Sequence, residues 1–234
     1  MSAGSVFLIP TVLHEEAIET IPAYVLDAVK SCQVFFVENE KTARRFLKKL
    51  WREMVIDDYQ WVAIHKAEEN VRREFIRLLA AGKNIGIISE AGCPGIADPG
   101  QLLTEAAQEK GFTIKPLVGP SSILLALMAS GMNGQGFQFH GYLPIDSAER
   151  KKKIKELEAD SRKRNCTQIF IETPYRNNAL TGDLLQCCQE QTRICIAVDI
   201  TASTENIRTR TVKQWKQQPT DIHKRLAIFL IHAS

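Results

Sequence analysis

The residues best suited to hold a ligand lie in one glycine-rich segment, Ser89 to Gly100, which reads SEAGCPGIADPG. It directly follows an apolar run, Asn84 to Ile88. Glycine has no Cβ, so its backbone can approach a ligand closely, and Asp98 followed by Pro99 is typical of a helix start. Spacing alone leaves two interpretations open: a loop that binds an unknown ligand, or a tight turn between a strand and a helix.

Two common phosphate-binding patterns do not occur in the sequence. No G-x-G-x-x-G follows the first apolar run, Val6 to Ile9, and no lysine follows the glycine-rich segment as a nucleoside-triphosphate loop would require. The six cysteines include no CxxC pair, so we expect reduced thiols and no metal site. Cys93 has no basic neighbour in the sequence, which argues against a nucleophilic thiolate.

Short β-branched runs alternate with helical patterns in the first half of the chain. The best helix, about Ala67 to Ala81, has apolar residues at helical spacing. This alternation predicts an α/β fold with a doubly wound parallel sheet, and ligands bind such sheets outside the carboxyl ends of the strands. We expect strands at Ser5 to Ile9, Gln33 to Val37, Trp61 to Ile64, Asn84 to Ile88 and Thr113 to Leu117.

The pattern changes after Gly119, where strands begin to follow one another without long crossovers. We therefore predict a second α/β domain with a mixed sheet, and the two domains as residues 1–116 and 117–234. Helices are expected at Ser122 to Ser130, Ala148 to Lys163 and Pro174 to Gln189. Strands are expected at Phe137 to Tyr142, Thr167 to Glu172, Arg193 to Thr201, Ile207 to Val212 and Arg225 to His232.

The composition sets limits on location and partners. Of 234 residues, 44% are hydrophobic, enough for a core in each half, and no apolar run is long enough for a membrane span or a signal-peptide core, so we expect a cytoplasmic protein. The net charge of +3 is too small to be a nucleic-acid signature by itself. The helix after Ala148 is locally basic, either as a solvated face or as a phosphate-contacting patch. Its first cations are Arg150, Lys151, Lys152, Lys153 and Lys155.

The glycine-rich segment resembles the S-D-A-G-x-P-x-x-S-D-P-G signature of the ribosomal-RNA cytidine 2′-O-methyltransferases, a branch of the tetrapyrrole-methylase superfamily. FLIPT (Phe7 to Thr11) is similar to that family's L-V-P-T, VGPSSILLALMASG (Val118 to Gly131) to its P-G-P-S-A-x-x-x-A-L-x-x-S-G, and IFIETPYR (Ile169 to Arg176) to its F-Y-E-x-P-x-R. The resemblance spans nearly the whole chain. It implies two α/β domains with S-adenosylmethionine in the cleft between them, methyl transfer without a metal, ribosomal RNA as the substrate and a homodimer.

The resemblance also implies roles for single residues. Glu38 and Lys41 lie in a stretch similar to A-E-D-T-R and are candidates to assist a poorly nucleophilic ribose hydroxyl, as is His65. Glu38 can equally be interpreted as a helix-capping acid. The cofactor-binding residues that the resemblance implies are Pro10, Ala91, Gly92, Cys93, Ile96, Ser121, Ser122, Glu172 and Ile200.

Several positions depart from the family pattern where substrate would be handled. Leu13 and His14 lie where the family has P-I-G-N, Asn39 replaces an acidic residue, and Ala202 replaces a cation. These departures keep two alternatives open: a methyltransferase acting on a tetrapyrrole, and a catalytically inactive relative that binds RNA or a partner protein.

Overall fold

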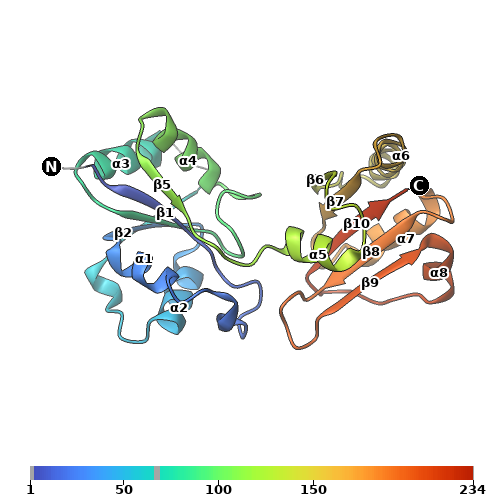
Figure 1. Cartoon of the computed structure of the whole chain (residues 1–234), viewed down its shortest axis with the longest axis horizontal. Helices are drawn as coiled ribbons and strands as arrows, with labels where there is room; N and C mark the ends of the chain where they lie inside the picture. Colours follow the sequence, from blue (N-terminus) through green and yellow to red (C-terminus); the bar gives the residue numbers. More distant parts are fainter. Residues whose placement is uncertain (1–2, 66–68, 234) are drawn as a thin grey trace. The chain divides into compact units, whose positions relative to one another are not determined.

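The computed structural model describes residues 3–65 and 69–233 of the chain. It divides into two compact units, Met1–Ser121 and Ser122–Ser234 (Figure 1). Each unit contains one five-stranded sheet. The domain boundary between residues 116 and 117 stays a prediction.

The first unit is a parallel sheet with strand order β3-β2-β4-β1-β5, which confirms the predicted doubly wound sheet. Strands β2 and β4 are buried along their whole length, which explains their continuously apolar sequences. The predicted start of the helix at Ala67 lies outside the described residues, and the described part of this helix, α3, begins at Glu69. The elements are β1 (Ser5–Ile9), η1 (Ile18–Thr20), α1 (Val25–Ser31), β2 (Val34–Val37), α2 (Glu40–Leu50), η2 (Ile56–Asp58), β3 (Gln60–Ala63), α3 (Glu69–Ala80), β4 (Ile85–Ile88), α4 (Gly100–Glu109) and β5 (Thr113–Pro116).

Two apolar clusters fill the first unit, one on each face of its sheet. Phe35 packs with residues of α1 and α2, whereas Phe36 packs with residues of α3 and α4. Neighbouring side chains of a strand point to opposite faces, so β2 supplies both clusters. Full burial of such a side chain contributes about 1.5–3 kcal/mol. The rigid layers place the loop after β4 at the carboxyl edge of the sheet.

The second unit has a mixed sheet with strand order β6-β7-β10-β8-β9, as predicted. Strands β6 and β7 are parallel, and every other neighbouring pair is antiparallel. Its main apolar cluster includes Phe170 and Phe229, whose stacked rings lie 6.1 Å apart. The elements are α5 (Ser122–Ser130), β6 (Phe137–Tyr142), α6 (Ser147–Arg164), β7 (Thr167–Ile171), α7 (Asn177–Cys187), β8 (Arg193–Val198), β9 (Asn206–Thr211), α8 (Val212–Gln217) and β10 (Ala227–His232).

Two predicted boundaries in this unit were wrong by three residues, and both lie at the same edge of the sheet. Helix α7 begins at Asn177 instead of Pro174, because a turn closed by the Arg176 N–H and the Thr173 carbonyl precedes it. Strand β8 ends at Val198 instead of Thr201, because φ is +50° at Asp199 and a strand cannot continue through that conformation.

Candidate functional site

In the first unit, the loop after β4 is fastened to the end of β1. The Thr11 N–H donates to the Gly92 carbonyl at 2.9 Å, and the Thr11 hydroxyl donates to the Ser89 carbonyl at 3.4 Å. The two strands are neighbours in the sheet, so their carboxyl ends lie together. The topology thereby places Pro10, which precedes Thr11, beside the glycine-rich loop.

Gly92 is tightly surrounded on the side where a side chain would lie. Its φ is +74°, and a Cβ there would lie 3.3 Å from Leu13 Cδ2 and 3.3 Å from the Pro120 carbonyl oxygen. Leu13, one of the departures from the family pattern, therefore forms one wall around Gly92. The positive φ at Gly92 is a conformation that favours glycine over residues with a side chain.

The segment after β5 closes the same region from a third side. A Cβ on Gly119 would lie 2.1 Å from Pro10 Cβ, so the Pro10 ring lies directly against the Gly119 backbone. The Cys93 thiol donates to the Pro120 carbonyl at 3.5 Å. Burial raises the pKa of the Cys93 thiol, which favours a neutral donor over a nucleophilic thiolate.

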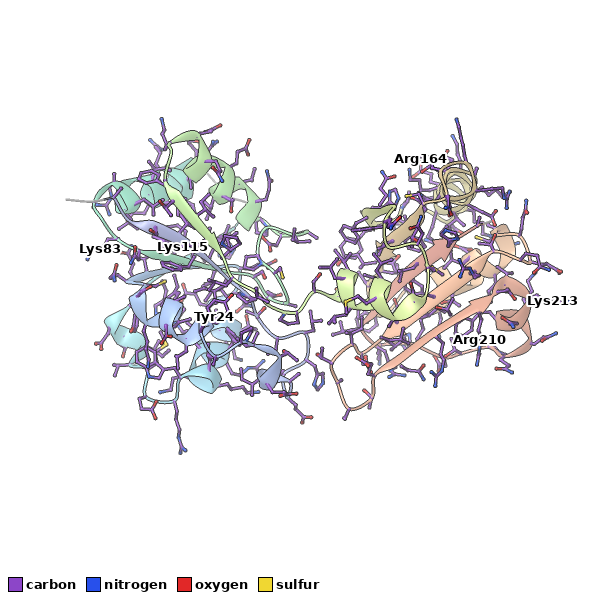
Figure 2. All side chains as sticks on the ribbon, in the orientation of Figure 1. Tyr24, Lys83, Lys115, Arg164, Arg210 and Lys213 are labelled. Carbon is purple, nitrogen blue, oxygen red and sulfur yellow. The ribbon has the colours of Figure 1, made fainter. Side chains whose placement is uncertain are left out.

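Tyr24 holds the beginning of this segment. The Val118 N–H donates to the Tyr24 hydroxyl oxygen at 2.6 Å, and the Tyr24 ring belongs to the first unit (labelled in Figure 2). Sequence reasoning missed this contact, because its partners are far apart in the chain.

The remaining predicted residues of these segments differ in exposure. Ala91 and Ile96 lie on the outer side of the loop, and Ile96 is 55% exposed. Ser121 and Ser122 are half-buried, and Ser122 is the first residue of α5. In the first unit the structure thus gathers Pro10, Gly92 and Cys93 around the Gly119 segment.

Glu38 links the end of β2 to the glycine-rich loop. Its Oε2 accepts the N–H of Glu90 at 3.1 Å. Burial raises the pKa of the Glu38 carboxyl, and the nearby negative charges of Asp98 and Glu90 raise it further, against the lowering effect of the Glu90 N–H. A carboxylate with a raised pKa is a stronger base than an ordinary one, so Glu38 is suited to accept a proton at this loop.

The cap of α2 is Asn39 and not Glu38, so the helix-capping interpretation of Glu38 was wrong. Asn39 Oδ1 accepts the N–H groups of Lys41 at 3.0 Å and Thr42 at 3.3 Å. Asparagine and aspartate cap helices almost equally well, so this departure preserves the local structure. The side chains of Lys41 and His65 are exposed.

Asp98 shapes the other end of the loop. Its two carboxylate oxygens accept the N–H groups of Gly100 at 2.7 Å and Gly95 at 2.8 Å, and α4 then begins at Gly100 behind Pro99. Burial raises the pKa of Asp98, while these hydrogen bonds oppose the increase. The predicted helix start at Asp98 and Pro99 therefore falls within a residue of the observed one.

In the second unit, the topology brings Glu172 and Ile200 to one edge of the sheet. Strands β7 and β8 both pair with β10 in the antiparallel sense, so they run in the same direction and their carboxyl ends flank its first residues. Glu172 follows β7 and Ile200 follows β8, and both side chains are buried. Glu172 Oε1 accepts from Arg176 Nη2 at 2.6 Å, whereas Glu172 Oε2 has no hydrogen-bond partner.

Arg225 joins the two sides of this edge, and sequence reasoning did not find it. Its guanidinium donates to Asp199 Oδ2 at 2.9 Å through Nε, and its carbonyl accepts from Asn177 Nδ2 at 2.7 Å. Ala202, which replaces a cation of the family pattern, is 9% exposed. A cation from the segment before β10 therefore lies beside the loop in which Ala202 replaces one.

One residue of the predicted basic patch must be corrected. Arg150 is buried, and its Nη2 lies 2.6 Å from Asp183 Oδ2 while its Nη1 donates to the Ile145 carbonyl at 2.7 Å. This guanidinium joins α6 to α7 and the loop after β6, so it is not available to a phosphate. Lys151 lies 3.5 Å from Asp183, whereas Lys152 and Lys155 are exposed and form no ion pair with another described residue.

Comparisons with known proteins identify the family of the chain. The family described as Tetrapyrrole (Corrin/Porphyrin) Methylases matches residues 17–215. The chain belongs to the tetrapyrrole methylase family. This family consists of methyltransferases that use S-adenosylmethionine, so the chain is a methyltransferase with S-adenosylmethionine as its methyl donor.

Two curated relatives of this tetrapyrrole methylase come from bacteria. It is 28% identical over 233 residues to the ribosomal RNA small subunit methyltransferase I of Vibrio cholerae serotype O1, covering 98% of this chain and 77% of that protein. It is 28% identical over 211 residues to the protein of the same name from Bacillus subtilis (strain 168), covering 90% and 68%.

Solved structures share the fold of the whole chain. Diphthine synthase superposes with a TM-score of 0.69 at 14% identity, covering 98% of this chain and 89% of that chain. The methyltransferase CobJ gives a TM-score of 0.64 at 15% identity, covering 100% and 95%. The predicted fold class is thereby confirmed. In the described part of the chain, no helix is both long and apolar enough to cross a membrane, and no cluster of three metal-ligating side chains occurs.

Proposed function

We propose that this tetrapyrrole methylase transfers a methyl group to the 2′-hydroxyl of a cytidine in small-subunit ribosomal RNA. The main support is the glycine-rich loop, whose sequence resembles the signature of that branch and whose Gly92 lies between Thr11, Leu13 and Pro120. The names of the curated relatives point to the same substrate class, and the match with the Vibrio cholerae protein extends over 98% of the chain.

The residues gathered in each unit fit the two ends of the methyl donor. The backbone around Gly92 and the two serines at the beginning of α5 suit its methionine part, because N–H groups and small hydroxyls at a helix N-terminus bind a carboxylate. The buried edge near Glu172 suits its adenosine. We assign cofactor binding to Pro10, Ala91, Gly92, Cys93, Ile96, Ser121, Ser122, Glu172 and Ile200.

For methyl transfer, the protein mainly has to align the methyl donor with the ribose hydroxyl and remove the hydroxyl proton. When bound, S-adenosylmethionine supplies a methyl group on a sulfonium that leaves as a neutral thioether. The ribose oxygen forms the new bond to carbon and gives up its proton. We assign that proton to Glu38, whose raised pKa and place at the loop suit a general base, with Lys41 close to it in the first turn of α2.

Exposed side chains suggest where RNA and a second copy of the chain would bind. We propose that Lys152 and Lys155 contact RNA phosphates, because they are exposed and lie on one helix. We also propose a homodimer through β6, an edge strand on which Phe137 is 42% and Tyr142 60% exposed. Ribosomal RNA as the substrate implies a cytoplasmic protein.

Methyl transfer from labelled S-adenosylmethionine tests the proposal directly. The acceptors to compare are hypomethylated small ribosomal subunits and precorrin substrates, with subunits that already carry the modification as the matched control. Label in the hypomethylated subunits alone is the expected result. Label in the precorrin alone would identify a tetrapyrrole methyltransferase, and cofactor binding without transfer to either acceptor would support an inactive relative.

A further inference from the structure

The last residues of the first unit lie between β5 and α5 and are held by few hydrogen bonds. The Leu117 N–H still donates to a carbonyl of β1, and the Val118 N–H donates to the Tyr24 hydroxyl at 2.6 Å. No described residue accepts a hydrogen bond from the N–H of Gly119 or Ser121. The Tyr24 hydroxyl is therefore the last acceptor that fixes a backbone N–H before the chain enters α5.

Tyr24 is itself fixed to the body of the first unit. It directly precedes α1, and its carbonyl accepts the N–H groups of Asp27 at 3.2 Å and Ala28 at 3.4 Å. The next residue, Val25, is fully buried in the apolar cluster that α1 and α2 form with the sheet. Tyr24 therefore presents its hydroxyl from a rigid element, and such elements hold a site more precisely than loops do (Figure 2).

The end of the first unit packs against three residues that we assign to the cofactor. The Gly119 backbone lies against the Pro10 ring, and the Pro120 carbonyl accepts from the Cys93 thiol at 3.5 Å. The same carbonyl oxygen would lie 3.3 Å from a Cβ on Gly92. A shift of this segment therefore displaces the surroundings of the glycine-rich loop and the partner of the thiol together.

The hydrogen bond between Tyr24 and Val118 contributes little to stability, because both residues are accessible to water. Tyr24 is 46% exposed, and Val118 is 68% exposed. Water can replace either partner, so the loss of this bond changes the free energy of unfolding only slightly. Water would satisfy the Val118 N–H equally well, but it would not fix the position of this N–H relative to α1.

We propose that Tyr24 is a positioning residue for methyl transfer. Through the Val118 N–H, it holds Gly119 and Pro120 against the residues assigned to the methionine part of the cofactor. Methyl transfer requires donor and acceptor in line, and a displacement of about 1 Å can lower the rate roughly 10²-fold. The inference rests on the proposed function, since the residues that Tyr24 positions are assigned to the cofactor there.

The substitution Tyr24→Phe tests the proposal, because it removes the hydroxyl and keeps the ring. We expect the Tm to change by less than about 2 °C, since the lost bond is exposed. The affinity for S-adenosylhomocysteine, measured by calorimetry, should fall about three- to tenfold. With hypomethylated small ribosomal subunits, kcat should fall about tenfold at an unchanged KM for the subunits, because Tyr24 aligns the donor and does not contact RNA.

The matched control is Tyr59→Phe in the same unit. The Tyr59 ring packs against Phe35 with ring centroids 5.4 Å apart, and its hydroxyl forms no hydrogen bond with a described residue. This variant also loses one phenolic hydroxyl, but it should keep the cofactor affinity and the kcat of the parent protein.

Removing the donor instead of the acceptor tests whether Tyr24 acts through Val118. Replacing Val118 by its α-hydroxy acid turns the amide N–H into an ester oxygen and keeps the side chain. Alone, this change should match Tyr24→Phe, and the two changes together should cost no more than either one. Additive losses would show that Tyr24 does not act through Val118, and so would contradict the inference.

Two results for Tyr24→Phe would also overturn the inference. One is a cofactor affinity and a kcat equal to those of the parent protein. The other is a large loss of Tm that accounts for the weaker binding, which would give Tyr24 a structural role only. Absence of methyl transfer to ribosomal subunits by the parent protein would contradict the proposed RNA substrate, whereas the affinity for S-adenosylhomocysteine would still test Tyr24.

Discussion

The ring of Pro10 lies directly against the backbone of Gly119: a Cβ added to Gly119 would lie 2.1 Å from Pro10 Cβ and 2.5 Å from Pro10 Cγ. The Cys93 thiol is also directed at the Gly119 carbonyl, at 3.8 Å. The ends of β1 and β5 and the loop after β4 can therefore come together only because position 119 has no side chain.

The substitution Gly119→Ala should displace this segment. Overpacking of a filled site costs about 1–3 kcal/mol, so we expect a lower urea midpoint and weaker binding of S-adenosylhomocysteine. Gly134→Ala is the matched control, because a Cβ there meets nothing within 4 Å. Full cofactor affinity in Gly119→Ala would show that the contact with Pro10 does not shape the site.

The substitution Gly92→Val should abolish cofactor binding. The new side chain meets Leu13 and the Pro120 carbonyl, and φ +74° adds a conformational cost of about 1–2 kcal/mol. Gly111→Ala separates these effects, since Gly111 has φ +72° and open space around it. We expect Gly111→Ala to lose stability alone, and Gly92→Val to lose S-adenosylhomocysteine binding in calorimetry as well. Equal affinity in the two variants would mean that the loop has a structural role only.

The raised pKa of Glu38 predicts a pH dependence of both stability and rate. Because its folded-state pKa lies above the ordinary value of 4.5, the contribution of Glu38 to stability is fully present below that value and is lost as pH rises through the folded-state pKa. The stability of Glu38→Gln relative to the parent protein should therefore increase over the same interval. Methyl transfer should increase as the carboxyl ionises, and Glu38→Gln should lose about 10²- to 10⁴-fold in rate. A flat stability difference together with an unchanged rate would contradict the assignment.

The ion pair of Arg150 and Asp183 should matter for stability and not for RNA binding. Arg150→Met leaves the Asp183 carboxylate buried, with Lys151 as its remaining ion-pair partner among the described residues, which should cost about 3 kcal/mol in urea unfolding. Lys153→Met is the control, because its pair with Glu156 is long, at 3.9 Å, and exposed, so the expected change is within about 0.5 kcal/mol. A small loss of stability in Arg150→Met together with reduced RNA affinity would show that Arg150 contacts phosphate after all.

The sequence predicted the sheets well because their strands are governed by local patterns. A strand such as β2, buried on both faces, is apolar at every position, and that pattern identifies it without knowledge of its neighbours. The end of β8 could not be predicted, since Asp199 pairs with Arg225, which is distant in the sequence. The start of α7 was misplaced because Thr173 and Pro174 are typical of a helix start, whereas they form a turn before the helix. The burial of Arg150 was hidden for the same reason: its partner Asp183 lies on another helix.

The parts of the site that were predicted are those formed by single continuous segments of the chain. The glycine-rich loop and Pro10 are evident from the sequence, because glycine and proline have narrow structural roles. The neighbours of Gly92, which are Leu13 and the Pro120 carbonyl, could not be predicted. Their local sequence does not indicate a contact with Gly92.

The basic face of α6 decides whether the chain contacts RNA through this helix. Changing Lys152 and Lys155 to glutamine removes two exposed charges spaced three residues apart. Each phosphate contact on single-stranded RNA contributes a slope of roughly 0.7 in log affinity against log salt, so the slope should flatten by about 1.4. The control is the double change of Lys213 and Lys216, which are exposed with the same spacing on α8 (Lys213 is labelled in Figure 2). If both double variants change the slope equally, RNA binding responds to net charge alone, and α6 is a solvated helix face.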